Sequence, residues 1–432
     1  MKDLDKKPIA DIRRFQQKEL ATLLSYVQKN SPYYQRVFKE HDIAISSIKE
    51  IADLQKIPVT TKDDLFLHNK DFFCVSEDEI IDYITTSGTL GDPVIFAMTN
   101  ADLDRLAYNE CLSFETSGIK KTDIIQLMTT IDRRFMAGLA YFLGARQLGA
   151  GIIRVGNGIP GLQWDTIKRM KPNVIVAVPS FILKIIEYAE EKGIDYKNSS
   201  VKKAICIGEP LRDQDFEFNK LAKKIKAKWD IQLFSTYAST EMATAFNECE
   251  AGKGGHQHPE LIIVELLDEN NEVVPENQAG EITITTLGVE GMPLLRFKTG
   301  DIARAYYEPC SCGRNSMRLG PVMGRRKQMI KYKGTTLYPA ALYDVLVDFE
   351  DIQDYYVQVK TNDIGTDEVS IHILTTNSSK EYIKNIKDHF RAKLRVAPDI
   401  VVVDSQNMKN MKYPEDQRKP RIFIDLRKQS SC

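Results

Sequence analysis

The chain has 432 residues, more than the ~250–300 at which single cores usually stop growing, so we expect two domains. Its residues are 43% hydrophobic, 28% charged and 9% aromatic, which excludes collagen-like, disordered and coiled-coil proteins. Lysine and arginine number 59 and aspartate and glutamate 60, so the net charge of −1 gives no field that would favour nucleic acid or anionic lipid as a partner.

No stretch approaches the roughly 20 apolar residues that span a bilayer, since the longest, residues 174–183, contains a proline. The first residues are charged throughout and lack the apolar core of a signal peptide, so we expect a cytoplasmic protein. Seven unevenly placed cysteines are too few for a disulfide framework in a chain of this length. A cysteine cluster would therefore indicate metal binding or catalysis.

The predicted elements change character along the chain. Apolar residues at helical spacing predict an opening helix over residues 9–27. From residue 123 to 241, five short apolar runs alternate with amphipathic stretches, which predicts a parallel sheet covered by helices. After residue 261 the pattern changes to paired strands with turn residues between them. Near residue 327 a second unit begins, with helices predicted at 340–347 and 379–394 and a loop over 407–420.

We therefore predict an α/β protein with two domains. The large N-terminal domain spans residues 1–326 and ends in a β-rich subdomain over about 245–326. The small C-terminal α+β domain spans residues 327–432.

The segment TTSGTLGDP, residues 85–93, carries the strongest chemical signal. Its two glycines allow a loop in which backbone N–H groups and hydroxyls converge on phosphate oxygens. The residues predicted to form this cradle are Thr86, Ser87, Gly88, Thr89 and Gly91. A plain turn between two strands is the alternative, and the segment alone does not decide between them.

Three cysteines and a histidine form a second signal. Cys249 and His256 flank a glycine-rich loop, and Cys310 and Cys312 form a Cys-x-Cys pair, a donor set that suits tetrahedral Zn²⁺. Both pairs flank the predicted β-rich subdomain, so we expect them to converge on a structural zinc. His258 is the rival fourth ligand, and a set of thiols without metal is the alternative. The remaining cysteines are expected in the core or on the surface: Cys74, Cys111, Cys206 and Cys432.

The glycine loop resembles the phosphate loop of adenylate-forming enzymes, the acyl-CoA synthetases, adenylation domains and luciferases. Further motifs follow in that family's order: YASTE at 237–241, RFKTGD at 296–301, GRRK at 324–327 and a lysine before the final strand. GMPLLRFKTGD, the stretch CSCGR at 310–314 and the chain length make it most similar to the phenylacetate-CoA ligase branch.

The resemblance implies a role for each matching residue. Glu241 would bind Mg²⁺ and Thr240 would hydrogen-bond the α-phosphate of ATP. Tyr237 would stack on adenine, beside an adenine-contacting turn formed by Gly208, Glu209 and Pro210. Asp301 and Arg325 would bind the ribose hydroxyls. Without the resemblance, we would interpret Asp301 as a turn residue at the end of a strand.

The resemblance also makes the small domain a mobile lid. Lys419 would reach the carboxylate and α-phosphate during adenylation, although alone it reads as an exposed loop lysine. Lys327 would be the hinge about which the lid turns, and Gly334 would then line a pantetheine tunnel. A plain interdomain linker is the alternative for the hinge.

Two departures from the family pattern concern the substrates. Asp92 stands in the glycine loop where the family usually has a lysine, which we interpret as tuning of ATP binding. Arg133 and Arg134 replace a Tyr/Gly-rich segment of phenylacetate ligases and indicate an acid with a polar ring substituent. A surface loop is an equal alternative for these arginines.

The resemblance implies an ATP-dependent ligase for a small aromatic carboxylic acid. It would form an acyl-adenylate and then a coenzyme A thioester, releasing AMP and pyrophosphate, with Mg²⁺ and a structural Zn²⁺. Delivery of the acyl group to a carrier protein, adenylylation of a cofactor, and a catalytically silent nucleotide-binding scaffold stay open. The oligomeric state is also open, a homodimer included, and no nucleic acid or membrane partner is expected.

Overall fold

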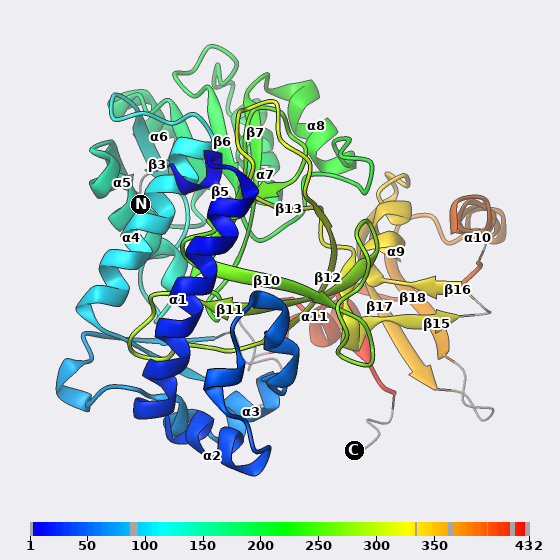
Figure 1. The fold of residues 1–432 in the computed structure, drawn as a ribbon. Helices are drawn as coiled ribbons and strands as arrows, with labels where there is room; N and C mark the ends of the chain where they lie inside the picture. Colours follow the sequence, from blue (N-terminus) through cyan, green and yellow to red (C-terminus); the bar gives the residue numbers. More distant parts are fainter. Residues whose placement is uncertain are drawn as a thin grey trace. The chain divides into compact units, whose positions relative to one another are not determined.

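The computed structural model describes residues 3–86, 94–332, 335–361, 367–394, 396–414 and 420–427, without the side chains of Lys327, Lys331, Thr335 and Thr336. The chain divides into two compact units, Met1–Val322 and Met323–Cys432. Figure 1 shows the fold, and each unit is described by itself.

The described helices of the first unit surround its sheets. They are α1 (Ile9–Asn30), α2 (Pro32–Glu40), α3 (Lys62–Leu67), α4 (Asn100–Thr116), α5 (Met136–Leu148), α6 (Pro160–Met170), α7 (Pro179–Glu191) and α8 (Lys220–Lys228). Short 3₁₀ helices lie at η1 (Leu4–Lys6), η2 (Ile45–Ser47), η3 (Ile51–Lys56), η4 (Asn69–Phe72) and η5 (Glu77–Glu79). The predicted opening helix is confirmed as α1, whose buried face includes Leu20, Leu23 and Leu24.

The strands of the first unit form a small hairpin and one long sheet. The hairpin pairs β1 (Asp82–Thr85) with β2 (Ile95–Met98). The others are β3 (Ile124–Leu127), β4 (Gly151–Arg154), β5 (Val174–Ala177), β6 (Lys203–Cys206), β7 (Gln232–Ser239), β8 (Thr244–Glu248), β9 (Gly255–His256), β10 (Ile262–Leu267), β11 (Ala279–Thr286), β12 (Phe297–Tyr306) and β13 (Arg318–Leu319). The sheet order is β10-β11-β12-β13-β9-β8-β7-β6-β5-β3-β4.

Strand β7 joins the two parts of this long sheet. Its first half pairs in parallel with β6, and its second half pairs antiparallel with β8. On one side β4, β3, β5, β6 and β7 are all parallel, as the βα alternation predicts. On the other side β10, β11 and β12 are antiparallel, as the paired strand patterns predict.

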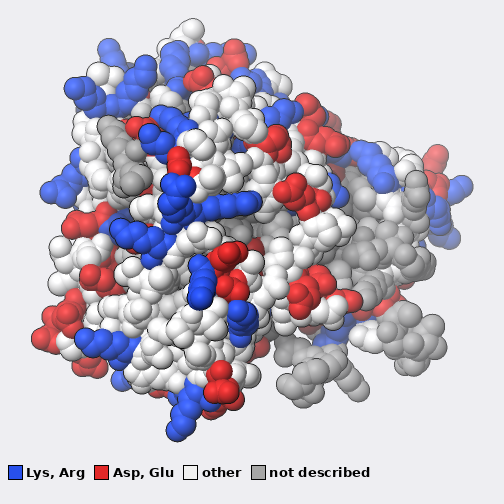
Figure 2. All heavy atoms as spheres, in the orientation of Figure 1, with Lys and Arg blue, Asp and Glu red and all other residues white. Residues whose placement is uncertain are grey.

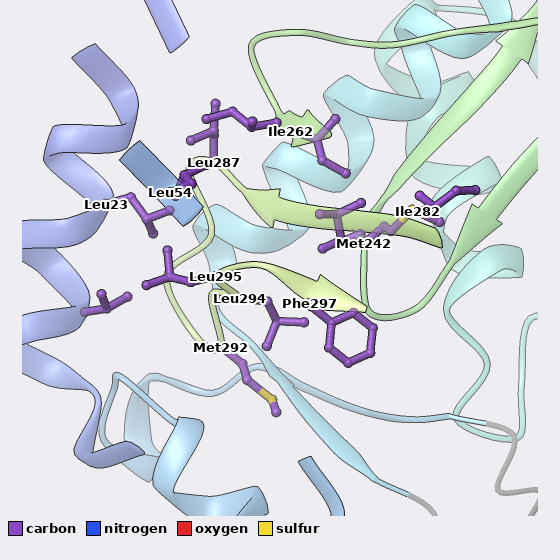
Figure 3. Packing of buried hydrophobic residues seen from close by; sticks show 14 of the residues in the cluster. Leu23, Leu54, Met242, Ile262, Ile282, Leu287, Met292, Leu294, Leu295 and Phe297 are labelled. Carbon is purple, nitrogen blue, oxygen red and sulfur yellow. The ribbon is translucent and has the colours of Figure 1, made fainter. Parts of the chain in front are cut away.

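Three hydrophobic clusters flank the sheets of this unit, and two of them are larger than the third. One packs α1 and the following segment against β10, β11 and β12, and Figure 3 labels Leu23, Ile282, Leu295 and Phe297 among its residues. The other lies under the parallel strands, where Trp164 and Trp229 have ring centroids 5.4 Å apart. These clusters hold the strand ends at which the candidate site lies.

A buried arginine ties α4 to the antiparallel strands. The Arg105 guanidinium donates to the carbonyl oxygens of Leu287 at 2.7 Å, Ala243 at 2.7 Å and Leu261 at 2.6 Å. Burial lowers the pKa of Arg105 to about 10. Because Ala243 follows the turn that carries Glu241, Arg105 fixes the backbone beside that carboxylate.

The second unit is a small α+β structure with its own core. Its elements are β14 (Gly324–Arg325), η6 (Arg326–Gln328), β15 (Ile330–Tyr332), β16 (Thr335–Leu337), α9 (Pro339–Leu346), β17 (Ile352–Thr361), β18 (Asp367–Thr375), α10 (Lys380–Leu394), β19 (Asp399–Val402), α11 (Ser405–Lys412) and β20 (Phe423–Asp425). Four strands form a sheet in the order β19-β18-β17-β20. Residues from this sheet, α9 and α10 pack together in its core.

The loop predicted over residues 407–420 is wrong in its first part, which belongs to helix α11. Residues 415–419 of that segment lie outside the described residues. Asp404 caps this helix by accepting from the Asn407 N–H at 2.7 Å. Met408 is buried with Tyr356 and Ile424. The sequence did not predict this helix because it is mostly polar, with one narrow apolar stripe that faces the core.

The charged side chains of the surface are mixed. Figure 2 shows lysine and arginine side chains interspersed with aspartate and glutamate over the visible face, in keeping with the net charge of −1. No helix among the described residues combines the length and the apolar character that a membrane span requires.

One carboxyl group lies buried in the packing of α4 against α5. Glu110 Oε1 accepts from Asn109 Nδ2 at 3.1 Å, and Oε2 has no hydrogen-bond partner among the described residues. The two helices pack closely here, since a Cβ on Gly144 would lie 2.3 Å from Glu110 Cβ. Burial raises the pKa of Glu110 from its usual 4.5 to about 8.

Glu110 should therefore make the stability depend on pH. The folded state keeps the Glu110 proton to higher pH than the unfolded chain does. The contribution of this group to the free energy of unfolding is therefore full below about pH 4.5 and is lost as the pH rises towards 8. In the wild type, the free energy of unfolding should fall by up to ~1.4 kcal/mol per pH unit within this window. We expect Glu110→Gln to reduce that fall. Urea unfolding between pH 5 and 8 measures it.

The matched control is Glu115→Gln, an exposed change on the same helix. Its unfolding free energy should follow the wild-type pH dependence. Equal pH dependence in the Glu110→Gln protein and the wild type would contradict the assignment of a neutral buried carboxyl.

Candidate functional site

The candidate site begins at the carboxyl ends of the parallel strands. Segments that follow such ends meet at one edge of the sheet, where α/β proteins commonly bind ligands. The predicted turn of Gly208, Glu209 and Pro210 follows β6, and Gly208 has a φ of +75°. Because Cys206 of β6 is paired with Ser235 of β7, this turn lies beside the middle of β7.

The carboxylate of Glu209 caps helix α7. Its Oε2 accepts from the Ser180 N–H at 2.9 Å, and its Oε1 accepts from Ser180 Oγ at 2.8 Å. A carboxylate at a helix N-terminus satisfies free N–H groups and complements the helix dipole. The turn is thereby fixed to α7, a function of Glu209 that its sequence context did not indicate.

Two of the predicted nucleotide-binding residues touch each other. Tyr237 of β7 donates its hydroxyl hydrogen bond to Asp301 Oδ2 of β12 at 2.8 Å. Asp301 N–H in turn donates to Thr299 Oγ1 at 3.1 Å. Burial, with the nearby Asp301 carboxylate, raises the pKa of Tyr237 well above its usual value, so this phenol stays a donor.

The turn between β7 and β8 carries Thr240 and Glu241. It is a tight turn, because the Ala243 N–H donates to Thr240 O at 3.2 Å and Ala243 has a φ of +45°. The Glu241 side chain is 9% exposed, and its Oε1 lies 3.8 Å from Lys62 Nζ. The carboxylate predicted to bind Mg²⁺ therefore already faces a cation.

The sequence motifs did not include Lys62. It begins helix α3, directly after Thr61, which caps that helix in a capping box with Asp64. A Thr-x-x-Asp cap is visible in the sequence and predicts the helix start. Its closeness to Glu241 is a tertiary contact between segments far apart in the chain.

Backbone bonds hold the segment before Lys62 against β12. Thr60 N–H donates to Arg296 O at 3.0 Å, and Lys298 N–H donates to Thr60 O at 2.9 Å. The buried Arg296 guanidinium pairs with Glu265 at 3.1 Å and donates to Ile57 O at 2.7 Å. Arg296, the first residue of the RFKTGD segment, therefore holds the backbone of residues 57–60, which lead into Lys62.

The glycine loop lies between β1 and β2, as the strand patterns on either side of it predict. Of the predicted cradle, Thr86 is described, and its N–H donates to Val94 O at 3.1 Å. Ser87, Gly88, Thr89, Gly91 and the departing Asp92 lie outside the described residues. Just before the loop, the Thr85 N–H donates to Arg134 O at 3.1 Å.

Arg133 and Arg134 are exposed and follow β3 at the same edge of the sheet. Both have left-handed backbones, with φ of +62° and +58°. Non-glycine residues in this region are uncommon and strained, and strained residues cluster at functional sites.

The remaining predicted site residues belong to the second unit. Arg325 is exposed in β14, and Lys327 lies in η6 with its side chain outside the described part. Gly334 and Lys419 fall in the gaps of the described ranges. Their predicted roles therefore stay predictions.

The four predicted zinc ligands converge. Their ligand atoms lie within 4.8 Å of one another, with His256 Nε2 at 3.4 Å from Cys249 Sγ and 3.5 Å from Cys312 Sγ. Cys249 Sγ and Cys310 Sγ are 3.7 Å apart. In a tetrahedral zinc site, sulfur atoms lie about 3.8 Å apart and sulfur and nitrogen about 3.6 Å apart. The cluster therefore has the dimensions of such a site.

His258 is not part of this cluster. Its Nδ1 lies 3.0 Å from Asn109 Oδ1. Of the two histidines that the sequence left open as the fourth ligand, the geometry selects His256.

The pKa values of the cluster describe it without a metal ion. Burial lowers the pKa of His256 to about 3, so its ring is neutral and can donate a lone pair. Burial, with the neighbouring Cys312 and Cys310, raises the pKa of Cys249 to about 12. Several thiolates held this close need a positive charge among them, which a metal ion supplies.

The chain is similar to proteins of known function. The family model for AMP-binding enzymes matches residues 8–291. The chain is 28% identical to a phenylacetate-coenzyme A ligase of Thermus thermophilus, over 86% of this chain and 83% of that protein. A phenylacetate-coenzyme A ligase of Escherichia coli is 24% identical, over 97% and 96% of the two chains.

A solved structure shares the fold. The crystal structure of 2-hydroxyisobutyryl-CoA ligase in the postadenylation state aligns with a TM-score of 0.82 and 21% identity, over 97% of this chain and 90% of that one. The family match spans more than half of the chain and includes β7 and the Thr240–Glu241 turn. This chain belongs to the family of AMP-binding enzymes.

Proposed function

We propose that the protein is an ATP-dependent acid–CoA ligase. It joins a small aromatic carboxylic acid to AMP, releasing pyrophosphate, and then transfers the acyl group to coenzyme A, releasing AMP. The observation that carries this proposal is the grouping of Tyr237 in β7, Asp301 in β12 and Glu241 in the turn after β7, in a chain similar to phenylacetate-coenzyme A ligases. The aromatic acid and the CoA acceptor come from those relatives.

The nucleotide is held mainly by residues of the first unit, with Arg325 added from the second. Tyr237 packs on adenine beside the turn at Gly208, and Asp301 accepts from the ribose hydroxyls, with Arg325 as a second contact. Thr240 donates to the α-phosphate. Donors preorganised in this way stabilise charge that develops on the phosphate oxygens as the carboxylate attacks.

A divalent cation completes the site when bound. Glu241 is the residue that would hold Mg²⁺, as the family resemblance implies, since its carboxylate is buried beside Tyr237. The ion would offset the repulsion between the triphosphate and the attacking carboxylate. Thr86, Ser87, Gly88, Thr89 and Gly91 would cradle the remaining phosphate oxygens.

The two units then have separate tasks. The first unit is the adenylation domain, and the second is a lid that turns about Lys327. Lys419 acts in the first half-reaction and Gly334 lines the path of pantetheine in the second. This division follows the family resemblance and the two compact units of the chain.

The second metal has a structural role. Zn²⁺ held by Cys249, His256, Cys310 and Cys312 would link the loop after β8 to the loop before β13. A bound metal ion can hold two such loops together without a large core between them.

One assay tests the reaction. Carboxylate-dependent ATP–pyrophosphate exchange across a panel of aryl acids should respond to at least one acid, with arylacetates and polar-substituted aryl acids included. Discharge of the adenylate by CoA, by a phosphopantetheinyl carrier protein or by neither then identifies the acceptor. ATP binding without exchange for any acid would favour a silent scaffold and contradict the proposal.

Lys419 should separate the two half-reactions. Lys419→Ala removes a cation from the adenylation transition state, so we expect exchange to be lost. Thioester formation from a supplied acyl-adenylate should stay nearly intact, because that step does not use this lysine. Equal losses in both steps would show that the assignment of Lys419 is wrong.

Lys62 should assist the first half-reaction. It places a positive charge beside Glu241, at a site where the glycine loop lacks its usual lysine. We expect Lys62→Met to lower the exchange rate or raise the KM for ATP by about tenfold, the effect of ~1.4 kcal/mol of lost stabilisation. Steady-state exchange at varied Mg²⁺ and ATP measures both quantities.

Lys56→Met is the matched control for Lys62. Its side chain is equally exposed, at 51%, and pairs with Asp53 away from Glu241. Unchanged exchange in the Lys62→Met protein, or an equal loss in both variants, would remove Lys62 from the account.

The zinc prediction concerns metal content and stability. Purified protein should contain one equivalent of zinc, and Cys310→Ser should remove it and lower the Tm, because a buried ligand of the cluster is lost. Cys111→Ser, outside the cluster, should keep the metal. A metal-free wild type with the same Tm before and after chelation would contradict a structural zinc.

A further inference from the structure

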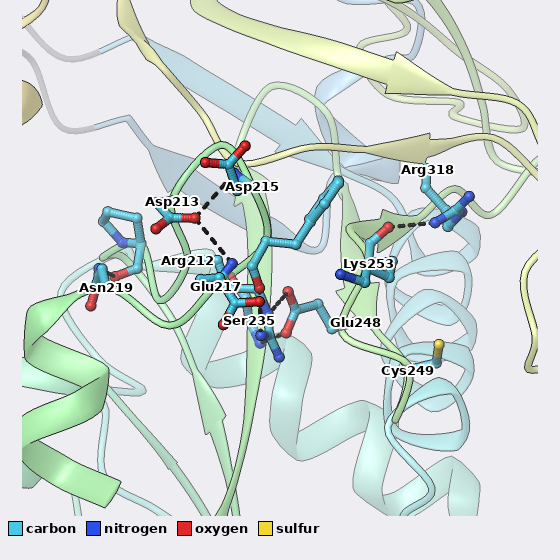
Figure 4. A network of polar contacts seen from close by, with 12 residues as sticks. Arg212, Asp213, Asp215, Glu217, Asn219, Ser235, Glu248, Cys249, Lys253 and Arg318 are labelled. Carbon is cyan, nitrogen blue, oxygen red and sulfur yellow. Dashed lines mark hydrogen bonds and ion pairs between the residues drawn. The ribbon is translucent and has the colours of Figure 1, made fainter.

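Arg212 lies between the nucleotide-binding turn and the metal-binding loop. It follows Pro210 by two residues, and its side chain is 13% exposed. Its Nε donates to Glu248 Oε1 at 2.7 Å and its Nη1 to Phe216 O at 2.9 Å. The guanidinium also lies 4.3 Å from the centre of the Phe218 ring. Figure 4 shows this network with Cys249 close by.

Glu248 connects Arg212 to the metal cluster. It is the last residue of β8 and directly precedes the ligand Cys249. Its Oε2 accepts from the Ser235 N–H of β7 at 3.1 Å, and its side chain is 4% exposed. A change in the position of Cys249 would therefore act on the carboxylate that holds Arg212.

The metal-binding loop makes a second contact with Arg212. Gly252 lies between Cys249 and His256, with a φ of +61°. A Cβ on this glycine would lie 2.4 Å from Arg212 Nη2. The loop backbone therefore packs directly on the guanidinium, and only glycine fits there without moving it.

On its other side, Arg212 is bound to the turn through the main chain. Arg212 and Phe218 form an antiparallel bridge, and Asn219 Nδ2 donates to Pro210 O at 2.7 Å. Leu211, between Pro210 and Arg212, is fully buried. A shift of Arg212 cannot be absorbed locally, because its neighbours on both sides are fixed.

We propose that Arg212 is a positioning residue that couples metal binding to nucleotide binding. The metal fixes the loop from Cys249 to His256, the loop holds Arg212 through Glu248 and Gly252, and Arg212 holds the turn at Gly208–Pro210. This inference rests on the proposed function, in which that turn contacts adenine and the cluster binds zinc. Linkage requires the effect to be reciprocal, so nucleotide also tightens metal binding.

Calorimetric titration with AMP tests the coupling. Zinc-loaded wild type should bind AMP about tenfold more tightly than protein stripped by a chelator, within the usual range of coupling. Arg212→Met should retain zinc but bind AMP about tenfold more weakly than wild type. Removal of its metal should then change the affinity little, because the connecting residue is already gone. A full tenfold response to metal removal in the Arg212→Met protein would overturn the proposal.

A second variant keeps Arg212 and all four metal ligands, so it decides the question even if chelation unfolds the protein. Gly252→Ala pushes on the guanidinium, so it should retain zinc but weaken AMP binding severalfold. Gly193→Ala is the matched control, since Gly193 has a similar φ of +65° and a Cβ added there would meet nothing within 4 Å. AMP affinity that is unchanged by Gly252→Ala, or lowered equally by Gly193→Ala, would overturn the proposal.

The outcomes distinguish this inference from the function on which it rests. Wild type that contains no metal, or that binds no AMP when loaded, contradicts the proposed function. Wild type that contains zinc and binds AMP with the same affinity before and after metal removal contradicts the coupling alone.

Discussion

The change of pairing along β7 is the constraint on which the candidate site depends. A strand that is parallel to β6 in its first half and antiparallel to β8 in its second must leave one kind of sheet and enter another. That change puts Tyr237 next to the carboxyl end of β6 and sends the chain into a tight turn at Thr240 and Glu241. The β10–β12 strands then bring Asp301 to the Tyr237 hydroxyl. Chemistry-bearing residues thus gather where two sheet types meet.

Charge is the second constraint at this place. Glu241 and Asp301 both lie near the partly buried Tyr237, and Lys62 forms an ion pair with Glu241. In the proposed function, such a site would hold a divalent cation and, with it, a polyphosphate. Thr60 and the buried Arg296 fix the segment before Lys62 against β12, and so fix the backbone that carries this positive charge.

Much of the fold followed from patterns that are local in sequence. The alternation of apolar runs and amphipathic stretches predicted the parallel strands, and three thiols with one imidazole predicted a cluster that the structure confirms. The motif resemblance predicted the family. Helix α11 was missed because its apolar stripe is narrow, and the Glu209 cap of α7 because a carboxylate in a turn carries no signal of its partner.

Contacts between distant segments could not be predicted in this way. Lys62 contacts Glu241, and Arg212 contacts Gly252, because the folded structure brings these segments together. A lysine after a helix cap and a glycine in a loop are too common to suggest such partners. The roles of Lys419 and Gly334 rest on the motif order, and a cytoplasmic location stays a prediction from the charged N-terminal residues.

The most direct test of the account is a crystal structure with a non-hydrolysable acyl-adenylate analogue bound. The account predicts that the adenine packs against Tyr237 beside the Gly208 turn, with the ribose hydroxyls on Asp301 and the phosphate mimic at Thr240. An analogue bound away from β7, with Tyr237 still donating to an unliganded Asp301, would contradict it.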